Sequence, residues 1–354
     1  MFATIGHVLF GNLFIGAGEG GLLWLIFKTP LRRSILWMIA ANYLSAIVGF
    51  MAIGGATAMV QPDIYNVRPL IVWAVAASFV ATIVVEWPFT WLILKGKTRR
   101  IAKALLASVI VQTASYGVLV PWYVTASDAN LLTQAHVERS LAFVKNKSAV
   151  VYYIVPQGNA LARVRLDGSP SETIMTVDSS GEDARLFAAK QAGAVMSDLY
   201  IARWNGTGDG DRKLLMPAFA PAAAAPDYGD YDIPFPMGYH IPAADLRPKN
   251  ERDWEFETHD GFQAPLVGYY KKGGGIRIEM DSPVLEWRVS SITALPGDEV
   301  VFQLGDQIVI LDRESMKLAL VARGTAPLVV LDSGDKPSGG REDIAPLTSE
   351  EGKT

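Results

Sequence analysis

The chain has 354 residues, of which 50% are hydrophobic and 19% charged, with a mean hydropathy of +0.22 and a net charge of -4. It contains no cysteine, which excludes disulfides, thiolate nucleophiles and cysteine metal sites. These averages combine two unlike parts. Residues 1–124 hold nine basic and three acidic residues, and the remainder holds 23 basic and 33 acidic residues. We expect a basic membrane part followed by an acidic soluble part.

Four long apolar runs occupy the first part, and each is about as long as the ~20 residues that cross a bilayer as a helix. They are Phe2 to Phe27, Ile35 to Val60, Leu70 to Leu94 and Ala104 to Val124. They predict a four-helix transmembrane domain over residues 1–124. The first run has no Lys or Arg before Lys28 and exceeds a signal-peptide apolar region, so we expect it to be retained.

The loops predict an orientation. The loop within each pair of runs is basic and has no acid, whereas the middle loop has only Asp63 and Arg68. The positive-inside rule then places both basic loops in the cytoplasm, and the N-terminus and everything after residue 124 outside. We expect a multi-pass protein of the bacterial cytoplasmic (inner) membrane with a periplasmic domain. The basic residues are Lys28, Arg32, Arg33, Lys95, Lys97, Arg99, Arg100 and Lys103.

Each apolar run carries one polar residue at the same depth. Glu19, Asn42, Glu86 and Gln112 each lie nine residues from a basic residue that borders a cytoplasmic loop. At ~1.5 Å per residue this is roughly 13 Å, near the middle of a hydrocarbon core about 30 Å thick. The sequence therefore predicts a polar layer inside the membrane.

The membrane half contains an internal repeat. An offset of 67 residues aligns the first helix and loop of one pair with those of the other, and an offset of 70 aligns the second helices. The pattern predicts a duplicated helical hairpin with parallel repeats about a pseudo-two-fold axis along the membrane normal. The aligned pairs are Glu19 with Glu86, Trp24 with Trp91, Lys28 with Lys95, Asn42 with Gln112 and Ser45 with Ser115.

Two interpretations of the polar layer remain open. Its residues either form a protonatable or cation-binding site, or they hydrogen-bond across helices and specify their pairing. We favour pairing, because four helices enclose little volume, although self-assembly would supply further walls. Gly16 and Gly20 bracket the first glutamate and predict that it faces another helix. The layer comprises Glu19, Asn42, Ser45, Glu86, Gln112 and Ser115.

A linker over 125–139 precedes a change of pattern to short β-type runs with turn signals. These runs predict an extracytoplasmic all-β domain over 140–335, dominated by hairpins, and a disordered tail over 336–354. The expected strands are Ala149 to Val155, Ala160 to Leu166, Leu199 to Trp204, Ile276 to Met280, Val300 to Leu304 and Gln307 to Leu311.

Three of these hairpins resemble the outer strands of β-propeller blades. The segments 151–168, 199–215 and 300–312 carry the resemblance, and the second strand of the first recurs 38 residues later in the second. A fourth unit is possible around 266–280. The resemblance implies a small or incomplete propeller, with a β-sandwich as the alternative, and it implies no catalytic residue.

A Pro-rich stretch over 216–248 predicts an irregular excursion that mixes acids with aromatics. We interpret it as a loop packed over the domain, with partner, sugar or calcium binding as alternatives. Its candidate partner-binding residues are Asp227, Tyr228, Asp230, Tyr231, Asp232, Phe235 and Tyr239.

No catalytic or cofactor motif is present in the sequence, and the four histidines lack metal-ligand spacing. Scattered acids at Asp253, Glu255, Glu257 and Asp260 are the only hint of a hydrolase, and we expect a solvated strand edge there. We predict a non-enzymatic, membrane-anchored accessory subunit without cofactor or metal. Its expected partners are the bilayer, an envelope protein complex and a second copy, and not nucleic acid; the alternative is proton- or cation-coupled transport through Glu19 and Glu86.

Overall fold

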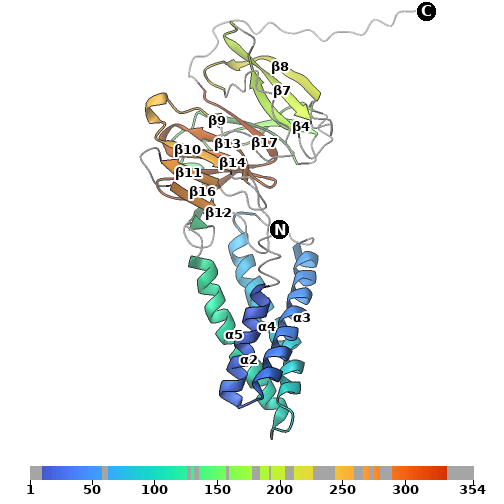
Figure 1. Ribbon diagram of the computed structural model, residues 1–354. Helices are drawn as coiled ribbons and strands as arrows, with labels where there is room; N and C mark the ends of the chain where they lie inside the picture. Colours follow the sequence, from blue (N-terminus) through green and yellow to red (C-terminus); the bar gives the residue numbers. More distant parts are fainter. Residues whose placement is uncertain are drawn as a thin grey trace, which may run out of the picture.

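The computed structural model contains a group of helices and a β-rich region stacked on one end of it (Figure 1). The structure describes residues 10–57, 63–125, 129–130, 135–156, 159–177, 184–190, 193–203, 211–225, 244–258, 266–270, 275–279 and 289–332. The division into helices followed by strands agrees with the predicted order of the two parts.

The described residues of the helical part form four helices, one within or over each of the four apolar runs. Two of them, α4 and α5 as far as Pro121, are long and apolar enough to cross a membrane, whereas α2 is shorter. The helices pack in the order α2, α3, α4, α5, with α5 returning to α2. Their bounds are α2 Asn12–Phe27, α3 Leu31–Thr57, α4 Val67–Ile93 and α5 Arg100–Thr125.

Glycine allows α2 and α3 to pack with their backbones in contact. A Cβ atom at Gly16 would lie 2.6 Å from the Cα of Ile39, and one at Gly20 would lie 2.5 Å from the Cα of Ile35. Both distances are shorter than any van der Waals contact, so neither position has room for a side chain. The predicted small-residue surface is therefore the α2–α3 interface, and Glu19 on α2 is 3% exposed.

The two helix-joining turns lie at the end of the helices away from the β sheets (Figure 1). α2 ends before Lys28, which adopts a left-handed conformation with φ 50°, and Pro30 follows. The second turn uses Gly96 at φ 90° and Arg99 at φ 53°. Left-handed residues and proline both stop a helix, so each hairpin turns within a few residues.

The described residues of the β region form four sheets, mostly antiparallel. The β17 sheet has the order β17-β3-β4-β5, the β7 sheet β6-β7-β8, the β11 sheet β1-β12-β11-β10, and the β15 sheet β2-β16-β15-β14-β13-β9. The strands are β1 Ala129–Asn130, β2 His136–Glu138, β3 Val150–Ile154, β4 Ala160–Arg165, β5 Glu172–Thr176, β6 Arg185–Ala189, β7 Met196–Arg203, β8 Asp211–Pro221, β9 Ala244–Asp245, β10 Trp254–Thr258, β11 Leu266–Tyr270, β12 Gly275–Glu279, β13 Val289–Leu295, β14 Glu299–Leu304, β15 Gln307–Asp312, β16 Lys317–Arg323 and β17 Thr325–Val330.

Three apolar cores join neighbouring sheets. The β7 and β17 sheets share a core that includes Leu186 and Leu328, and the β17 and β15 sheets share one that includes Val151 and Ile310. The β15 and β11 sheets share a third core around Phe302. The last strand, β17, pairs with β3, the first strand of its sheet. Closure of the sheets into a propeller ring is not seen among the described residues.

The expected hairpins are present, with two corrections at their margins. β8 continues to Pro221, so residues 216–221 form a strand where we expected an irregular stretch; its pairing with β7 overrides the proline signal. The linker over 125–139 contains β1 and β2, which pair in parallel with β12 and β16. Short parallel edge pairs have no periodicity of their own and gave no sequence signal.

The start of α4 fixes the β15 sheet to the helices. Asp63 and Asn66 close the turn before the helix reciprocally, because the backbone N–H of each donates to the other's side chain. The backbone N–H of Ile64 donates to Oε1 of Gln307 at 3.0 Å, and Arg323 pairs with Asp63 at 3.1 Å. We call these four contacts the junction. Ile64 and Gln307 are buried, so water does not compete for their hydrogen bond.

Replacing Gln307 with leucine should loosen the junction without unfolding the β sheet. Leucine has a similar volume but provides no acceptor, so the amide of Ile64 loses its partner. We expect hydrogen exchange at Ile64 to accelerate by about tenfold or more, which corresponds to roughly 1.4 kcal/mol for a lost buried hydrogen bond. Exchange mass spectrometry checks this, and unchanged protection of Ile64 with faster exchange in β15 would contradict it.

Candidate functional site

The structure brings all six predicted polar-layer residues together in the middle of the helical part. Glu19 lies on α2, Asn42 on α3, Glu86 on α4 and Gln112 on α5, and these four side chains are at most 6% exposed. Ser45 and Ser115 lie one turn further along α3 and α5. Every helix of the part therefore contributes to the layer.

Glu19 accepts hydrogen bonds from two helices. Its Oε2 accepts from Nδ2 of Asn42 on α3 at 2.5 Å. Its Oε1 accepts from Oγ of Ser115 at 2.6 Å and from Nε2 of Gln112 at 3.3 Å, both on α5. The carboxyl group therefore links α2 to α3 and α5, and both of its oxygens are occupied by side chains of the same chain.

Glu86 occupies the equivalent position in the second hairpin. Its Oε2 accepts from Nε2 of Gln112 on α5, and its Oε1 accepts from Oγ of Ser45 on α3 at 3.2 Å. Gln112 thus donates to both glutamates and bridges them. The two carboxyl groups therefore share one amide nitrogen as their donor.

These contacts obey the symmetry that the repeat predicts. Each glutamate accepts from the amide of its own hairpin, Asn42 for Glu19 and Gln112 for Glu86. Each also accepts from the serine of the other hairpin, Ser115 for Glu19 and Ser45 for Glu86. Exchange of the two hairpins therefore maps the network onto itself. Only the additional bond from Gln112 to Glu19 departs from it, because glutamine is one methylene longer than asparagine.

A second buried contact repeats one helical turn away and was missed from the sequence. In the first hairpin Leu23 on α2 and Met38 on α3 belong to one apolar core, both fully buried. The aligned residues of the second hairpin are Thr90 and Ser108, whose hydroxyl oxygens lie 2.8 Å apart. The same two offsets that align the glutamates and amides would have paired these positions. The aligned residues are apolar in one hairpin and carry hydroxyl groups in the other, so a search for identical residues does not find them.

The charge of the layer has no basic partner within the described residues. The hydrogen bonds that reach the two carboxyl groups come from amides and hydroxyls, and none comes from Lys, Arg or His. A pair of buried carboxylates needs a proton or a cation to offset its charge. The arrangement is chemically able either to hold a proton as a neutral hydrogen-bonded group, or to exchange it.

The second predicted site lies outside the described residues. All of the candidate partner-binding residues from Asp227 to Tyr239 fall within residues 226–243, so the structure does not test them. Among the residues that are described, no group of three or more His, Asp or Glu is placed to hold a metal ion. Of the four histidines, only His136 is described, and it lies in the short strand β2.

Of the scattered acids of the possible hydrolase site that the structure describes, one lines a pocket. Asp253 lines a pocket of about 390 Å³ with Glu251, Trp254, Asp298 and Arg313. Arg313 binds Asp298 at 3.0 Å, and its guanidinium lies 4.0 Å from the ring centroid of Trp254. Glu255 and Glu257 lie in β10 beyond this pocket, and Asp260 is outside the described residues.

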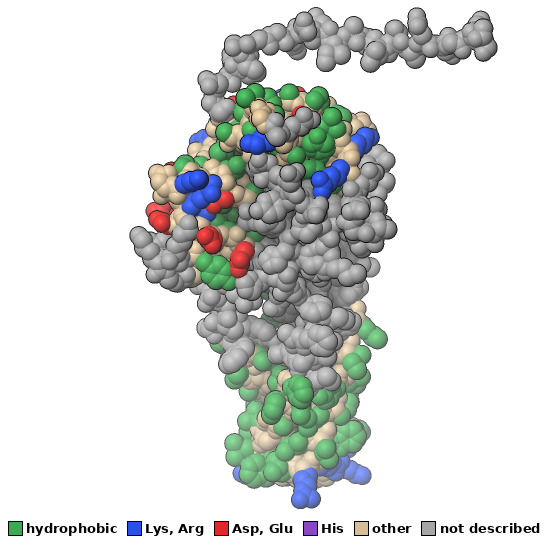
Figure 2. All heavy atoms as spheres, turned by 45° about the horizontal axis from the view of Figure 1, so that its top comes forward, with side chains coloured by type: hydrophobic (Ala, Val, Ile, Leu, Met, Phe, Trp, Pro, Cys, Tyr) green, Lys and Arg blue, Asp and Glu red, His purple; other side chains and the backbone are tan. Residues whose placement is uncertain are grey.

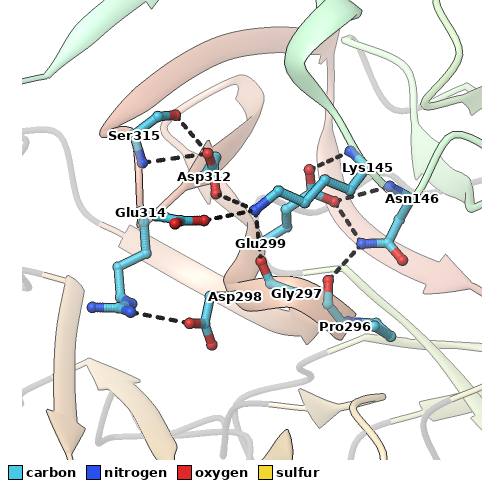
Figure 3. A network of polar contacts seen from close by, with 10 residues as sticks. Lys145, Asn146, Pro296, Gly297, Asp298, Glu299, Asp312, Glu314 and Ser315 are labelled. Carbon is cyan, nitrogen blue, oxygen red and sulfur yellow. Dashed lines mark hydrogen bonds and ion pairs between the residues drawn. The ribbon is translucent and has the colours of Figure 1, made fainter.

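A polar network beside this pocket fixes the chain before β3 to the β13–β14 turn (Figure 3). Glu299 is fully buried, and its carboxylate accepts the backbone N–H groups of Lys145 and Asn146 at 2.6 and 3.1 Å. The ammonium of Lys145 reaches Asp312 and Glu314, each at 3.3 Å. The first residue of β14 thus binds a loop that is distant in sequence.

Asp312 makes this network sensitive to acid. Burial alone would raise the pKa of Asp312, but the hydrogen bond from Ser315 and the charge of Lys145 outweigh it and lower the pKa below the ordinary 3.8. A carboxyl group whose folded pKa is lowered stabilises the fold above its unfolded pKa. That contribution disappears as the pH falls through the folded value.

Replacing Asp312 with asparagine should therefore lower stability at neutral pH and have a smaller effect in acid. We expect a loss of about 1 kcal/mol at pH 7, on the scale of a charge-assisted hydrogen bond, and a shrinking difference from wild type below pH 3.8. Thermal unfolding of the full chain in detergent across this range checks it. Glu314→Gln is the control, because Glu314 is 78% exposed; an equal loss at every pH would contradict the assignment.

Comparisons with known proteins give no family for the chain. No protein-family model matches it, and no match was found among curated proteins or among solved structures.

Proposed function

We propose that the protein is a non-enzymatic, membrane-anchored interaction protein, an accessory subunit that holds its β region against a membrane or envelope protein complex. The observation that carries this proposal is the junction, in which Gln307 and Arg323 of the β15 sheet bind the start of α4. A β region that is hydrogen-bonded and ion-paired to a membrane helix has a defined height and orientation above the bilayer. A β region held in this way presents the same surface to a partner protein at the membrane.

The polar layer supports the same proposal. All four oxygens of the two carboxyl groups accept hydrogen bonds from neighbouring helices of the chain. Bonds of this kind are worth roughly 0.6 to 2 kcal/mol each in membranes, and they favour one pairing of helices over others. We infer a four-span bundle of two duplicated hairpins, held in register by this layer, with both basic turns in the cytoplasm. The β region, in this proposal a small or incomplete set of propeller-like blades, is then extracytoplasmic, at the bacterial inner membrane.

Native mass spectrometry of the protein extracted from its own membrane in mild detergent tests this proposal. We expect a stoichiometric complex with another membrane or envelope protein, or with a second copy. The junction variant Gln307→Leu holds the β region less firmly on the helices. It should lose the bound partner while the β sheet remains folded. A lone monomer in repeated native extractions, with no specific partner after crosslinking in the membrane, would overturn the proposal.

A second function is favoured by one observation, the absence of a basic partner for Glu19 and Glu86 among the described contacts. In this alternative the two carboxyl groups, bridged by Gln112, exchange a proton or a small cation during transport. The β region would then act as a lid or regulator. The two alternatives differ in what happens when the carboxyl groups are replaced by amides, as argued in the Discussion.

A further inference from the structure

The basic residues of the two helix-joining turns form one surface. The turns come from separate hairpins, yet both lie at the end of the helices away from the β sheets (Figure 1). Figure 2 shows Lys and Arg side chains gathered at this end, below helices whose visible surface is largely hydrophobic. The sequence has no acid between residues 20 and 62 or between 87 and 127, so neither turn has an acidic residue of its own.

Two of these cations serve the fold itself. Arg33 on α3 donates to the carbonyl oxygen of Leu92 on α4 at 2.8 Å, which connects the two hairpins. Arg100 donates to the carbonyl oxygen of Trp91 at 2.6 Å, and its guanidinium lies 3.7 Å from the centroid of that ring. Both arginines donate to backbone carbonyls in the last turn of α4, where helix carbonyls are short of intrahelical donors.

Of the other six cations, Lys103 is half-buried and donates to Thr98 at 3.3 Å, and five are exposed. They repeat between the hairpins, since Lys28 aligns with Lys95 and Arg32 with Arg99. Tryptophan accompanies each set, because Trp24 is 47% exposed and Trp91 38% exposed. Exposed tryptophan beside exposed cations is the pattern of the membrane–water interface, where the ring lies at the level of the lipid head groups. The exposed basic residues are Lys28, Arg32, Lys95, Lys97 and Arg99.

We propose that this surface, which we call the basic end, binds the phosphate groups of anionic phospholipids in the facing leaflet. The inference rests on the proposed membrane topology and goes beyond it, because it assigns a ligand class to the basic end. Phosphodiesters lie at the depth of the turns and supply the counter-charge that the turns lack. Each basic residue close to an anionic surface strengthens binding by about fivefold, so several acting together give a clear preference for anionic lipid.

Lipid titration of the full chain in detergent, followed by native mass spectrometry, tests the proposal. The probes are phosphatidylglycerol and phosphatidylcholine with the same acyl chains. We expect wild type to retain phosphatidylglycerol at least about tenfold better, and the variant Lys28→Gln/Lys95→Gln/Lys97→Gln to lose most of that preference. The matched control Lys147→Gln/Lys213→Gln/Lys249→Gln removes the same charge from exposed lysines of the β region and should behave as wild type.

The outcomes separate this inference from the proposed function. Equal retention of the two lipids, or equal loss in both triple variants, overturns the basic end as a lipid site and leaves the membrane anchor intact. Failure to retain either lipid overturns the membrane anchor as well. Competition by free glycerol phosphate at the strength of the whole lipid would show a site for a soluble phosphate, which also overturns the proposal.

Discussion

Replacing Gly20 with leucine should separate α2 from α3 and give the largest loss of stability in the helical part. Even a methyl group there would lie 2.5 Å from the Cα and 2.6 Å from the backbone nitrogen of Ile35. Backbone atoms of a helix cannot rotate away as a side chain can, so the helices must move apart. We expect a loss of about 3 kcal/mol or more, the upper range for overpacking in a rigid environment. Thermal unfolding in detergent measures it.

The control for this change is the neighbouring residue. A Cβ atom at Gly21 would have no heavy atom within 4 Å, so Gly21→Leu adds the same side chain to the same helix in open space. It should leave stability nearly unchanged. Gly20→Ala should already cause part of the loss. If Gly20→Leu and Gly21→Leu unfold at the same temperature, α2 and α3 do not pack as described.

The glycine contact also sets the distance across the polar layer. Glu19 precedes Gly20, and its carboxyl group accepts from Asn42 on α3 at 2.5 Å. A shift of α2 by the width of a side chain would break this bond. Close packing through glycine and hydrogen bonding through the layer therefore depend on each other. Gly20→Leu should disrupt both the backbone contact between α2 and α3 and the hydrogen bond from Asn42 to Glu19.

The sequence was sufficient for the polar layer because its signal is geometric. Equal nine-residue separations from the basic turns place the four residues at one level along the helices, and the offsets of 67 and 70 determine which residues correspond. The structure places Glu19 with Asn42 and Ser115, and Glu86 with Gln112 and Ser45, as the duplication implies. The hairpins of the β region could also be predicted, because alternating apolar residues between turn signals define a strand locally.

The remaining features depend on contacts between distant residues. Nothing near Gln307 indicates that its side chain accepts from Ile64, 243 residues earlier, since a glutamine that starts a strand is ordinarily exposed. Glu299 likewise begins β14 directly after a turn, a position that is ordinarily exposed, yet it is fully buried and accepts the backbone N–H groups of Lys145 and Asn146. Such residues are distinguished by their tertiary partners, which local periodicity does not contain.

Replacing both glutamates with glutamine, as Glu19→Gln/Glu86→Gln, should preserve the folded helices. The glutamine side chain has nearly the shape of the protonated acid. Its carbonyl oxygen keeps one of the two acceptor positions, and its amide N–H, like the O–H of the neutral acid, donates to a serine hydroxyl or an amide oxygen that turns to accept it. We expect stability within about 1 kcal/mol of wild type. Glu19→Leu/Glu86→Leu keeps the volume but removes every acceptor, and at roughly 0.6 to 2 kcal/mol for each lost bond it should cost on the order of 3 kcal/mol or more.

These two variants decide between the proposed functions when folding and activity are measured together. If the layer only pairs helices, the glutamine variant keeps its partner in native mass spectrometry, and proteoliposomes containing wild type show no proton or cation flux. If the layer is a transport site, wild type carries a flux that the glutamine variant loses while its thermal unfolding is unchanged, because an amide cannot release a proton at this position. A leucine variant as stable as wild type would contradict the helix-pairing function, since the hydrogen bonds to Glu19 and Glu86 would then contribute nothing to the packing of the helices.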